Sequence, residues 1–523
     1  MISAAAAKVL GALFKIPLTN ILGGVGMSYF SCAYSLFMPI YALTVTGLSS
    51  AVARMTAKSA ALDMYSNIKR IRRTALLLFS GVGAVGSLAI IFLAQPFSRM
   101  SVGNSEAALA VTMIAPSVLL GCITAVERGY YEGMSNMYPT ALSQAAEGIV
   151  KVAAGLWLCG YVNSHGSEIM AYFPYVTDIR AMAAAAGILG VTLSSAGAAL
   201  FFGIMSIFRR NRQNGEELLL TRREIAGELA STALPVGISS VVTNLTALID
   251  MWTIMGCISY FGCRDNVPFG IAERDIPKFI YGSFAGIALT VFNLVPSVTN
   301  MLGKGILPEI TEAWAKSDRA ALQKGTVQAL LTAAVISVPA AVGLGVLSPQ
   351  ILHMLFERQS DEAELCVNSL RLLMPGMVCL CVSYPIFSML QGIGKASAPL
   401  KIMLLGTVIK LAGNLIFIPL MGVDGAAIST SLCYGAILAV SLATYVKTVK
   451  ISISPAPFAS VIYAGILCGA GAYLGADICG RYGFGNIAAT AWAVTIGGTV
   501  YILSLYLLSV KKYGLWAKKR TAA

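Results

Sequence analysis

Apolar stretches long enough to cross a lipid bilayer follow one another along almost the whole of this 523-residue sequence. A helix crosses the hydrocarbon core with about 20 apolar residues, and only helices or closed barrels satisfy their backbone hydrogen bonds in lipid. The expected spans are 2–22, 28–57, 74–98, 107–132, 138–160, 180–208, 226–259, 278–303, 326–350, 365–392, 398–420, 424–446, 456–479 and 485–510. Only 12% of the residues are charged, whereas a soluble domain carries about 25%. The sequence therefore predicts an all-α polytopic membrane protein with about 14 transmembrane helices.

The distribution of basic residues gives the expected topology. Of the Lys and Arg residues placed in loops, 23 lie on one side of the membrane and seven on the other. Because cytoplasmic loops are enriched in Lys and Arg, we expect both termini in the cytoplasm. The net charge of +13 then reflects membrane topology, and no nucleic-acid partner is expected.

The eleven cysteines and two histidines lack the spacing of a metal site. There is no CxxC motif, and many of the cysteines fall inside apolar spans, where a thiol behaves as a small apolar side chain. We expect no metal site and no catalytic residues, so the protein is predicted not to be an enzyme.

A segment of the sequence occurs twice. Residues 374–414 resemble residues 115–155, which lie 259 positions earlier. The aligned pairs are Pro116 and Pro375, Gly133 and Gly392, and Lys151 and Lys410. A second similarity follows each copy, at Gly187, Gly190 and Ser194 and at Gly422, Gly425 and Ser429. Each copy is predicted to be two apolar helices joined by a Gly/Pro turn, with a lysine near the middle of the second helix. Duplicated halves of this kind are typical of transporters.

The repeat and the polar segments predict the domain organisation. We expect two pseudo-symmetric six-helix lobes, at 1–208 and 226–446, joined by a cytoplasmic linker at 209–225. Residues 447–523 have no partner in the repeat. They are expected to form two further helices and a basic cytoplasmic tail.

Lys151 and Lys410 fall near the middle of their predicted spans. Charge at that depth costs a few kcal/mol and normally faces a cavity or a partner. Two interpretations remain open, a cavity lining and a structural ion pair. Glu147 lies one turn before Lys151 and is a possible partner for it, whereas Asn414, one turn after Lys410, is positioned to orient that lysine.

Lys8 and Lys15 are seven residues apart and share one face of the first span. Lys15 is deep enough to favour a cavity, whereas Lys8 can also extend its ammonium to the cytoplasmic interface. Arg54 lies toward the cytoplasmic end of its helix, so it can either line the cavity or extend its side chain to the cytoplasmic interface. A cavity lined by fixed positive charge suits an anionic group such as pyrophosphate and repels a cationic drug.

Asp250 shares a helix face with Thr246 in the seventh span. This pair predicts either a site for a coupling ion or a polar patch satisfied within the protein. We therefore expect no cofactor other than a coupling ion, Na⁺ or H⁺, with the membrane potential as the alternative source of energy.

Four segments carry a resemblance to a known family. They are KVLGALFKIPLTNILGGVGMSYFSCAYSLFMPIYALTVTGLSSAVARMTAK at 8–58, YGSFAGIALTVFNLVPSVTN at 281–300, LQGIGKASAP at 390–399 and IKLAGNLIFIPLMGVDGAAIST at 409–430. In this order they resemble the stage V sporulation protein B and MurJ-like branch of the MOP flippase superfamily. The resemblance spans both halves and implies a V-shaped, MATE/MurJ-like fold with two lobes and fourteen helices.

The resemblance also implies a function. Members of this branch move undecaprenyl-pyrophosphate-linked sugars, lipid II among them, across the bacterial cytoplasmic membrane by alternating access. Lys8 matches a basic cavity residue of the family, Lys15 lies close to a second, and Arg54 matches a basic position of the sporulation branch. The last two helices are expected to provide a groove for the lipid tail. We expect a monomer whose partners are the lipid-linked glycan and membrane lipids.

Two other classes of membrane protein are alternatives to the flippase interpretation. A cation-coupled multidrug exporter of the same superfamily normally has twelve helices and an acidic or apolar cavity. An integral-membrane glycosyltransferase or polymerase normally needs a large loop domain or clustered catalytic carboxylates. The longest outer loops, around 161–179 and 260–277, are too short to form such a domain.

Overall fold

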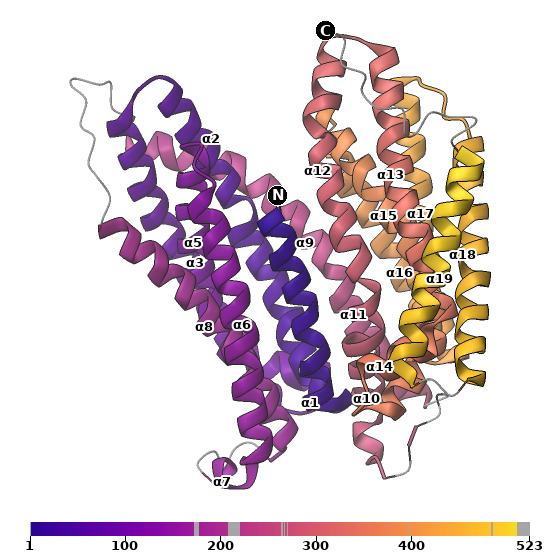
Figure 1. Cartoon of the computed structure of the whole chain (residues 1–523). Helices are drawn as coiled ribbons and strands as arrows, with labels where there is room; N and C mark the ends of the chain where they lie inside the picture. Colours follow the sequence, from indigo (N-terminus) through magenta and orange to yellow (C-terminus); the bar gives the residue numbers. More distant parts are fainter. Residues whose placement is uncertain are drawn as a thin grey trace. The chain divides into compact units, whose positions relative to one another are not determined.

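The computed structural model is built from helices, and the residues it describes contain no strand (Figure 1). The described residues are 2–171, 177–207, 220–262, 265, 267–268, 270–395, 397–482 and 485–509. Twelve helices are long and apolar enough to cross a membrane, or thirteen when the bent pair Glu273–Phe292 and Leu294–Ala315 counts as one span. The predicted all-α multi-pass fold is therefore confirmed.

The first of these helical stretches holds two spans. Phe14–Ala61 is 48 residues long, and Gly23 interrupts helix α1 (Ile2–Tyr41) with a φ of 63°. Sixteen residues of straight helix would separate Phe14 from Phe30 by about 24 Å, yet their ring centroids are 6.4 Å apart. The chain therefore reverses at Gly23, where a residue with a side chain would be strained. Gly23 thus separates residues 2–22 of α1 from the helical segment that follows, in agreement with the boundary expected between the first two spans.

The chain divides into two compact units. The first contains Met1–Tyr260 and Ile271–Gly286, and the second contains Phe261–Gly270 and Ile287–Ala523. The helices of the first unit are α1, η1 (Ala42–Thr46), α2 (Leu48–Ala61), α3 (Tyr65–Val102), α4 (Ala108–Ile114), α5 (Pro116–Gly133), α6 (Tyr138–Ser164), α7 (Gly166–Met170), α8 (Ile179–Ile207), α9 (Arg222–Phe261), η2 (Glu273–Asp275) and α10 (Ile276–Ser283). The π-helical turn η3 (Phe284–Ala288) crosses into the second unit. Its helices are α11 (Leu289–Phe292), α12 (Leu294–Ala315), α13 (Arg319–Val346), α14 (Ser348–Leu355), α15 (Ser360–Gly392), α16 (Ala398–Met421), α17 (Val423–Val449), α18 (Ala456–Arg481) and α19 (Asn486–Ser509).

This division differs from the boundary expected at 209–225, of which residues 209–219 lie outside the described part of the chain. Helix α9 belongs to the first unit because its apolar side chains pack into a core built on α2, where Leu229 joins Leu48 and Val52. Helix α10 packs against α1, and a Cβ placed on Gly24 would lie 2.6 Å from Ser283 Oγ. Side-chain packing between helices that precede and follow the predicted linker therefore determines which helices belong to the first unit.

Both copies of the sequence repeat form the same helix–turn–helix. Helices α5 and α15 end at Gly133 and Gly392, and α6 and α16 each begin with a proline in the first turn. A Cβ at Gly133 would lie 2.6 Å from the Ala53 carbonyl oxygen on α2, and one at Gly392 would lie 3.0 Å from Thr311 Oγ1 on α12. Each glycine thus lets its helix approach a neighbour closely.

The glycines that follow each copy also have matching roles. A Cβ at Gly190 on α8 would collide with the Gly155 backbone on α6. A Cβ at Gly425 on α17 would collide with the Phe417 carbonyl on α16. These collisions explain why small residues recur at the same positions in both copies.

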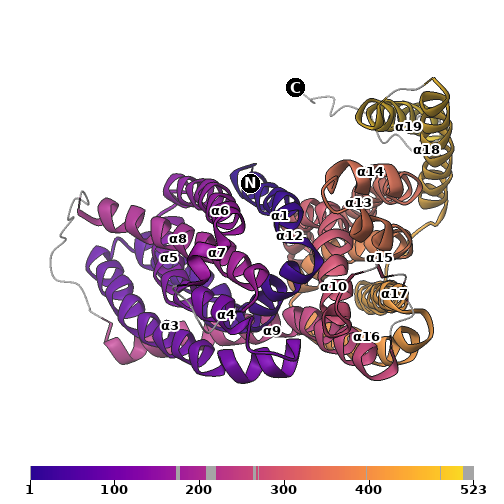
Figure 2. The same cartoon turned by 90° about the horizontal axis from the view of Figure 1, so that it is seen from below.

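Helices α18 and α19 lie side by side and pack on α13 within the second unit (Figures 1 and 2). Val461 and Val338 share an apolar cluster, and Tyr501 donates a hydrogen bond to the Val335 carbonyl at 2.8 Å. The two C-terminal spans are therefore anchored to that helix. The basic tail from residue 510 onward lies outside the described residues.

Candidate functional site

Lys15 and Lys151 meet in the first unit. Lys15 lies on α1 before the reversal at Gly23, and Lys151 lies near the middle of α6. Both side chains are partly buried, and Lys151 contacts the ring of Phe14, the residue that directly precedes Lys15. Helix α6 packs along α1, which brings together two charges that lie far apart in the sequence.

Aromatic rings form the surface beneath Lys151. Its Nζ lies 5.2 Å from the centroid of the Phe14 ring and 5.8 Å from that of Tyr34. Cation–π contacts of this kind stabilise a positive charge by about 0.5–2 kcal/mol. Among the side chains that the structure describes, neither Lys15 nor Lys151 has an ion-pair partner. The pair therefore presents two positive charges that a ligand with two negative charges can bridge.

Glu147 pairs with Arg128 rather than with Lys151. Arg128 Nη2 lies 2.6 Å from Glu147 Oε2, and Arg128 Nε donates to Ser143 Oγ at 3.1 Å. The possible Glu147–Lys151 pair is thus not the one formed, because α5 brings Arg128 beside the start of α6. Because Glu147 pairs with Arg128, the Lys151 ammonium group contacts the rings of Phe14 and Tyr34 and not a carboxylate.

Lys410 belongs to the second unit and is 3% exposed. Ser429 Oγ donates to the Lys410 carbonyl at 3.2 Å and also to Asn414 Oδ1. Asn414 is completely buried and so connects α16 to α17. Lys410 therefore occupies the repeat position of Lys151 in a more enclosed environment.

The other predicted basic residues lie in different settings. Lys8 is on α1, but its side chain lies outside what the structure describes. Arg54 is exposed on α2. A further basic residue within a span, Arg371 on α15, donates from Nε to Ser348 Oγ at 3.0 Å, so it has a structural partner.

Asp250 is 2% exposed on α9, and Thr246 is partly buried one turn before it. The division of the chain places both in the first unit, whereas the sequence had placed them in the second lobe. Asp250 is an electrostatic neighbour of Tyr281, on α10. Within the described residues, no group of three metal-ligating side chains has the geometry of a metal site.

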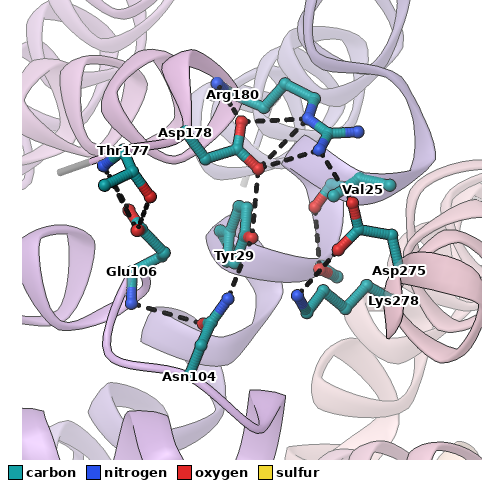
Figure 3. A network of polar contacts seen from close by, with 10 residues as sticks. Val25, Tyr29, Asn104, Glu106, Thr177, Asp178, Arg180, Asp275 and Lys278 are labelled. Atoms are coloured by element: carbon teal, nitrogen blue, oxygen red, sulfur yellow. Dashed lines mark hydrogen bonds and ion pairs between the residues drawn. The ribbon is translucent and has the colours of Figure 1, made fainter. Parts of the chain in front are cut away.

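A network of ion pairs that the sequence analysis missed lies near the ends of several helices of the first unit (Figure 3). Arg180 contacts Asp178 at 2.9 Å and Asp275 at 3.0 Å, and Lys278 contacts Asp275 at 2.9 Å. Tyr29 donates to Asp178 at 3.2 Å. Two pairs are close in the sequence, Asp275 with Lys278 and Asp178 with Arg180, whereas the Arg180–Asp275 and Tyr29–Asp178 contacts join distant segments.

A cavity of about 890 Å³ adjoins this network. Its lining includes Tyr29, Asp178, Trp252, Asp275 and Lys278. These residues come from helix ends and loops that the charge distribution assigns to the extracytoplasmic side.

The chain matches two protein families. Residues 1–262 match the family described as polysaccharide biosynthesis protein, and residues 283–416 match MatE. Two curated relatives come from Bacillus subtilis (strain 168). Lipid II flippase MurJ is 23% identical over 82% of this chain and 77% of its own length. Stage V sporulation protein B is 21% identical over 96% of this chain and 92% of its own length.

A solved structure of lipid II flippase MurJ in an inward closed conformation has the same fold. The TM-score is 0.69, with 15% identity over 97% of each chain. The helical fold and these matches define a multi-pass membrane transporter of the MOP superfamily. Within that class, the chain belongs to the polysaccharide biosynthesis protein family.

Proposed function

We propose that this protein is a flippase that moves an undecaprenyl-pyrophosphate-linked oligosaccharide, with lipid II as the first candidate, across the bacterial cytoplasmic membrane. The observation that carries the proposal is the Lys15–Lys151 pair. The Lys151 ammonium group rests against the rings of Phe14 and Tyr34, and Lys15 follows Phe14 directly in the sequence. No carboxylate among the described side chains forms an ion pair with either lysine. A pyrophosphate carries the complementary charge.

The physical problem of flipping is the charged head group. Unpaired negative charge is very costly in the low-dielectric centre of the bilayer, whereas the apolar polyprenyl tail is stable in the hydrocarbon. Lysines at mid-membrane depth offset that cost by pairing with the phosphates. Alternating access then lets the head group cross without contacting lipid. Flipping needs no covalent chemistry, which agrees with the relative that is named as a flippase.

The remaining predicted residues have subordinate roles in this proposal. Lys8 and Arg54 extend the positive charge toward the cytoplasm. Lys410, held near Asn414, meets substrate only after α16 and α17 rearrange, because its side chain is enclosed. Helices α18 and α19 carry exposed apolar side chains such as Ile466 and Leu503, which suits a path for the lipid tail.

Asp250 and Thr246 form the proposed site for a coupling ion, Na⁺ or H⁺. Burial of a carboxylate within a span is costly and is commonly associated with ion pathways. The protein would act as a monomer with both termini in the cytoplasm, in contact with the lipid-linked glycan and membrane lipids.

A cation-coupled multidrug exporter is the second candidate. The match of residues 283–416 to MatE and the buried Asp250 favour it. The Lys15–Lys151 pair argues against it, because a cationic drug would be repelled.

Complementation of a bacterium depleted of its own lipid II flippase tests the proposal. We expect the wild-type chain to restore growth and the Lys15→Glu variant at equal membrane abundance to fail. An exporter would instead raise drug tolerance in a drug-sensitive strain without restoring growth of the depleted strain, and that result would reject the flippase proposal.

A further inference from the structure

The cavity beside the Asp275 network has walls whose charges balance. Glu106, Asp178 and Asp275 are opposed by Arg274 and Lys278 in the lining and by Arg180 at the Asp178 and Asp275 carboxylates. Three acidic groups therefore meet three basic ones. A cavity without net charge gives no general preference for an anion or a cation.

The polar groups of the wall are held in fixed positions. Asp275 is 6% exposed and Lys278 is 4% exposed, and their ion pair is 2.9 Å long. Glu106 accepts a hydrogen bond from Thr177 Oγ1 at 2.6 Å. Figure 3 shows these residues converging from separate segments of the first unit. Such groups offer hydrogen-bond donors and acceptors at fixed places, which suits a ligand rich in hydroxyl and amide groups.

Trp252 supplies a flat apolar surface in the same cavity. Its side chain is 41% exposed, and its Nε1 donates to Ser101 Oγ at 2.9 Å. The Phe97 ring packs against it at a centroid distance of 6.2 Å. These two contacts fix the orientation of the indole and leave part of its surface available to a ligand.

We propose that this cavity binds a sugar of the lipid-linked head group on the extracytoplasmic side, with one ring stacked on Trp252 and its hydroxyls bonded to the balanced polar wall. The inference rests on the proposed flippase function and specifies where the glycan is held after crossing. An aromatic face beside fixed, neutralised polar groups matches the alternation of apolar and hydroxylated surfaces on a pyranose. The volume of about 890 Å³ lies within the usual range of small-molecule sites.

Gly256 allows the cavity to be closed without disturbing the fold. It lines the cavity one turn after Trp252, and a Cβ built there would meet nothing within 4 Å. Gly227 is a matched control, because it lies on the same helix, also has open space around its Cβ, and is not part of the lining. Gly256→Leu should fill the cavity, and Gly227→Leu should not.

The test measures binding of N,N′-diacetylchitobiose to the full-length protein in lipid nanodiscs by calorimetry. We expect saturable binding, lost in Gly256→Leu and retained in Gly227→Leu. Trp252→Ala should weaken binding about three- to tenfold and Trp252→Phe less. Trp157→Ala, which removes an exposed tryptophan on α6 outside the lining, should leave binding unchanged.

Three results would overturn the inference: no binding of the disaccharide, equal binding by Gly256→Leu and wild type, or competition by choline at equal concentration, which would indicate a cation site. Flippase complementation with the wild-type chain separates the two proposals. If the chain complements but the disaccharide does not bind in the cavity, this inference fails alone. If the disaccharide binds but the chain does not complement, the flippase proposal fails.

Discussion

Lys151 Nζ lies 5.2 Å from the centroid of the Phe14 ring. Phe14 directly precedes Lys15 in the sequence, so α1 supplies both Lys15 and part of the surface that Lys151 contacts. The reversal of α1 at Gly23 places Tyr34 on the same ammonium group, at 5.8 Å. The ring contacts partly offset the desolvation of Lys151 without neutralising its charge. The site therefore keeps a positive charge available for an anionic ligand.

Glu147 should be energetically coupled to Arg128. The pair is 2.6 Å apart and mostly buried, so removing either partner leaves a charge poorly satisfied. A double-mutant cycle on thermal stability with Arg128→Gln and Glu147→Gln should give a coupling of about 1–3 kcal/mol. The matched cycle of Glu147→Gln with Lys151→Gln should be additive within about 0.5 kcal/mol. Coupling in the second cycle and none in the first would reverse the pairing assigned here.

Asp265 should make stability depend on pH. Burial raises the pKa of this carboxyl to about 6, the Val423 backbone N–H opposes the rise, and Asp424 adds to it. Between the ordinary value of 3.8 and about 6, the folded protein retains a proton that the unfolded chain releases, so stability falls as pH rises through this window. Asp265→Asn should therefore melt at the same temperature as wild type below pH 4 and at a higher one above pH 6, as measured by scanning fluorimetry. A difference that does not change with pH would contradict this assignment.

The two faces of the protein should be distinguishable by thiol labelling. Lys316 and Arg274 are both exposed, and the charge distribution places them on opposite sides of the membrane. Lys316→Cys should react with an impermeant maleimide only after permeabilisation, whereas Arg274→Cys should react in intact cells. Background should be low because the described native cysteines are buried, apart from the partly buried Cys379. The reverse labelling pattern would invert the topology.

Asp250→Asn tests ion coupling. If the buried carboxylate binds Na⁺ or H⁺, transport in this variant should lose its dependence on the corresponding gradient while the protein remains in the membrane. Thr253→Val, which removes a hydroxyl that donates to the Ile249 carbonyl at 2.6 Å, is the control. Unchanged gradient dependence in Asp250→Asn would make Asp250 a structural residue.

The spans and the repeat could be predicted because bilayer thickness and backbone hydrogen bonding impose them on any sequence. Gly133 and Gly392 end matching helices as the repeat required. The choice of ion partners could not be predicted, because it depends on how helices rotate and pack. Glu147 had a lysine one turn away, yet it pairs with Arg128 across the α5–α6 turn.

The Asp275 network shows the same limit over a longer range. Arg180 and Asp275 are 95 residues apart, and span prediction places Arg180 at the start of a span and Asp275 in a loop without relating the two. The assignment of α9 to the first unit likewise depends on apolar contacts such as Leu229 with Leu48, which a hydropathy pattern does not specify. The basic residues were found from the sequence because charge is rare within spans.

The most direct test of the central claim is flipping of a fluorescent polyprenyl-pyrophosphate disaccharide in proteoliposomes containing Lys15 and Lys151 variants. The account predicts that Lys15→Glu and Lys151→Glu each abolish flipping, that Gln at either position slows it, and that Arg preserves it. Lys316→Glu, a charge reversal at an exposed position, should flip like wild type. Wild-type flipping rates in both Lys15→Glu and Lys151→Glu, at equal reconstitution, would show that the lysine pair does not carry the pyrophosphate.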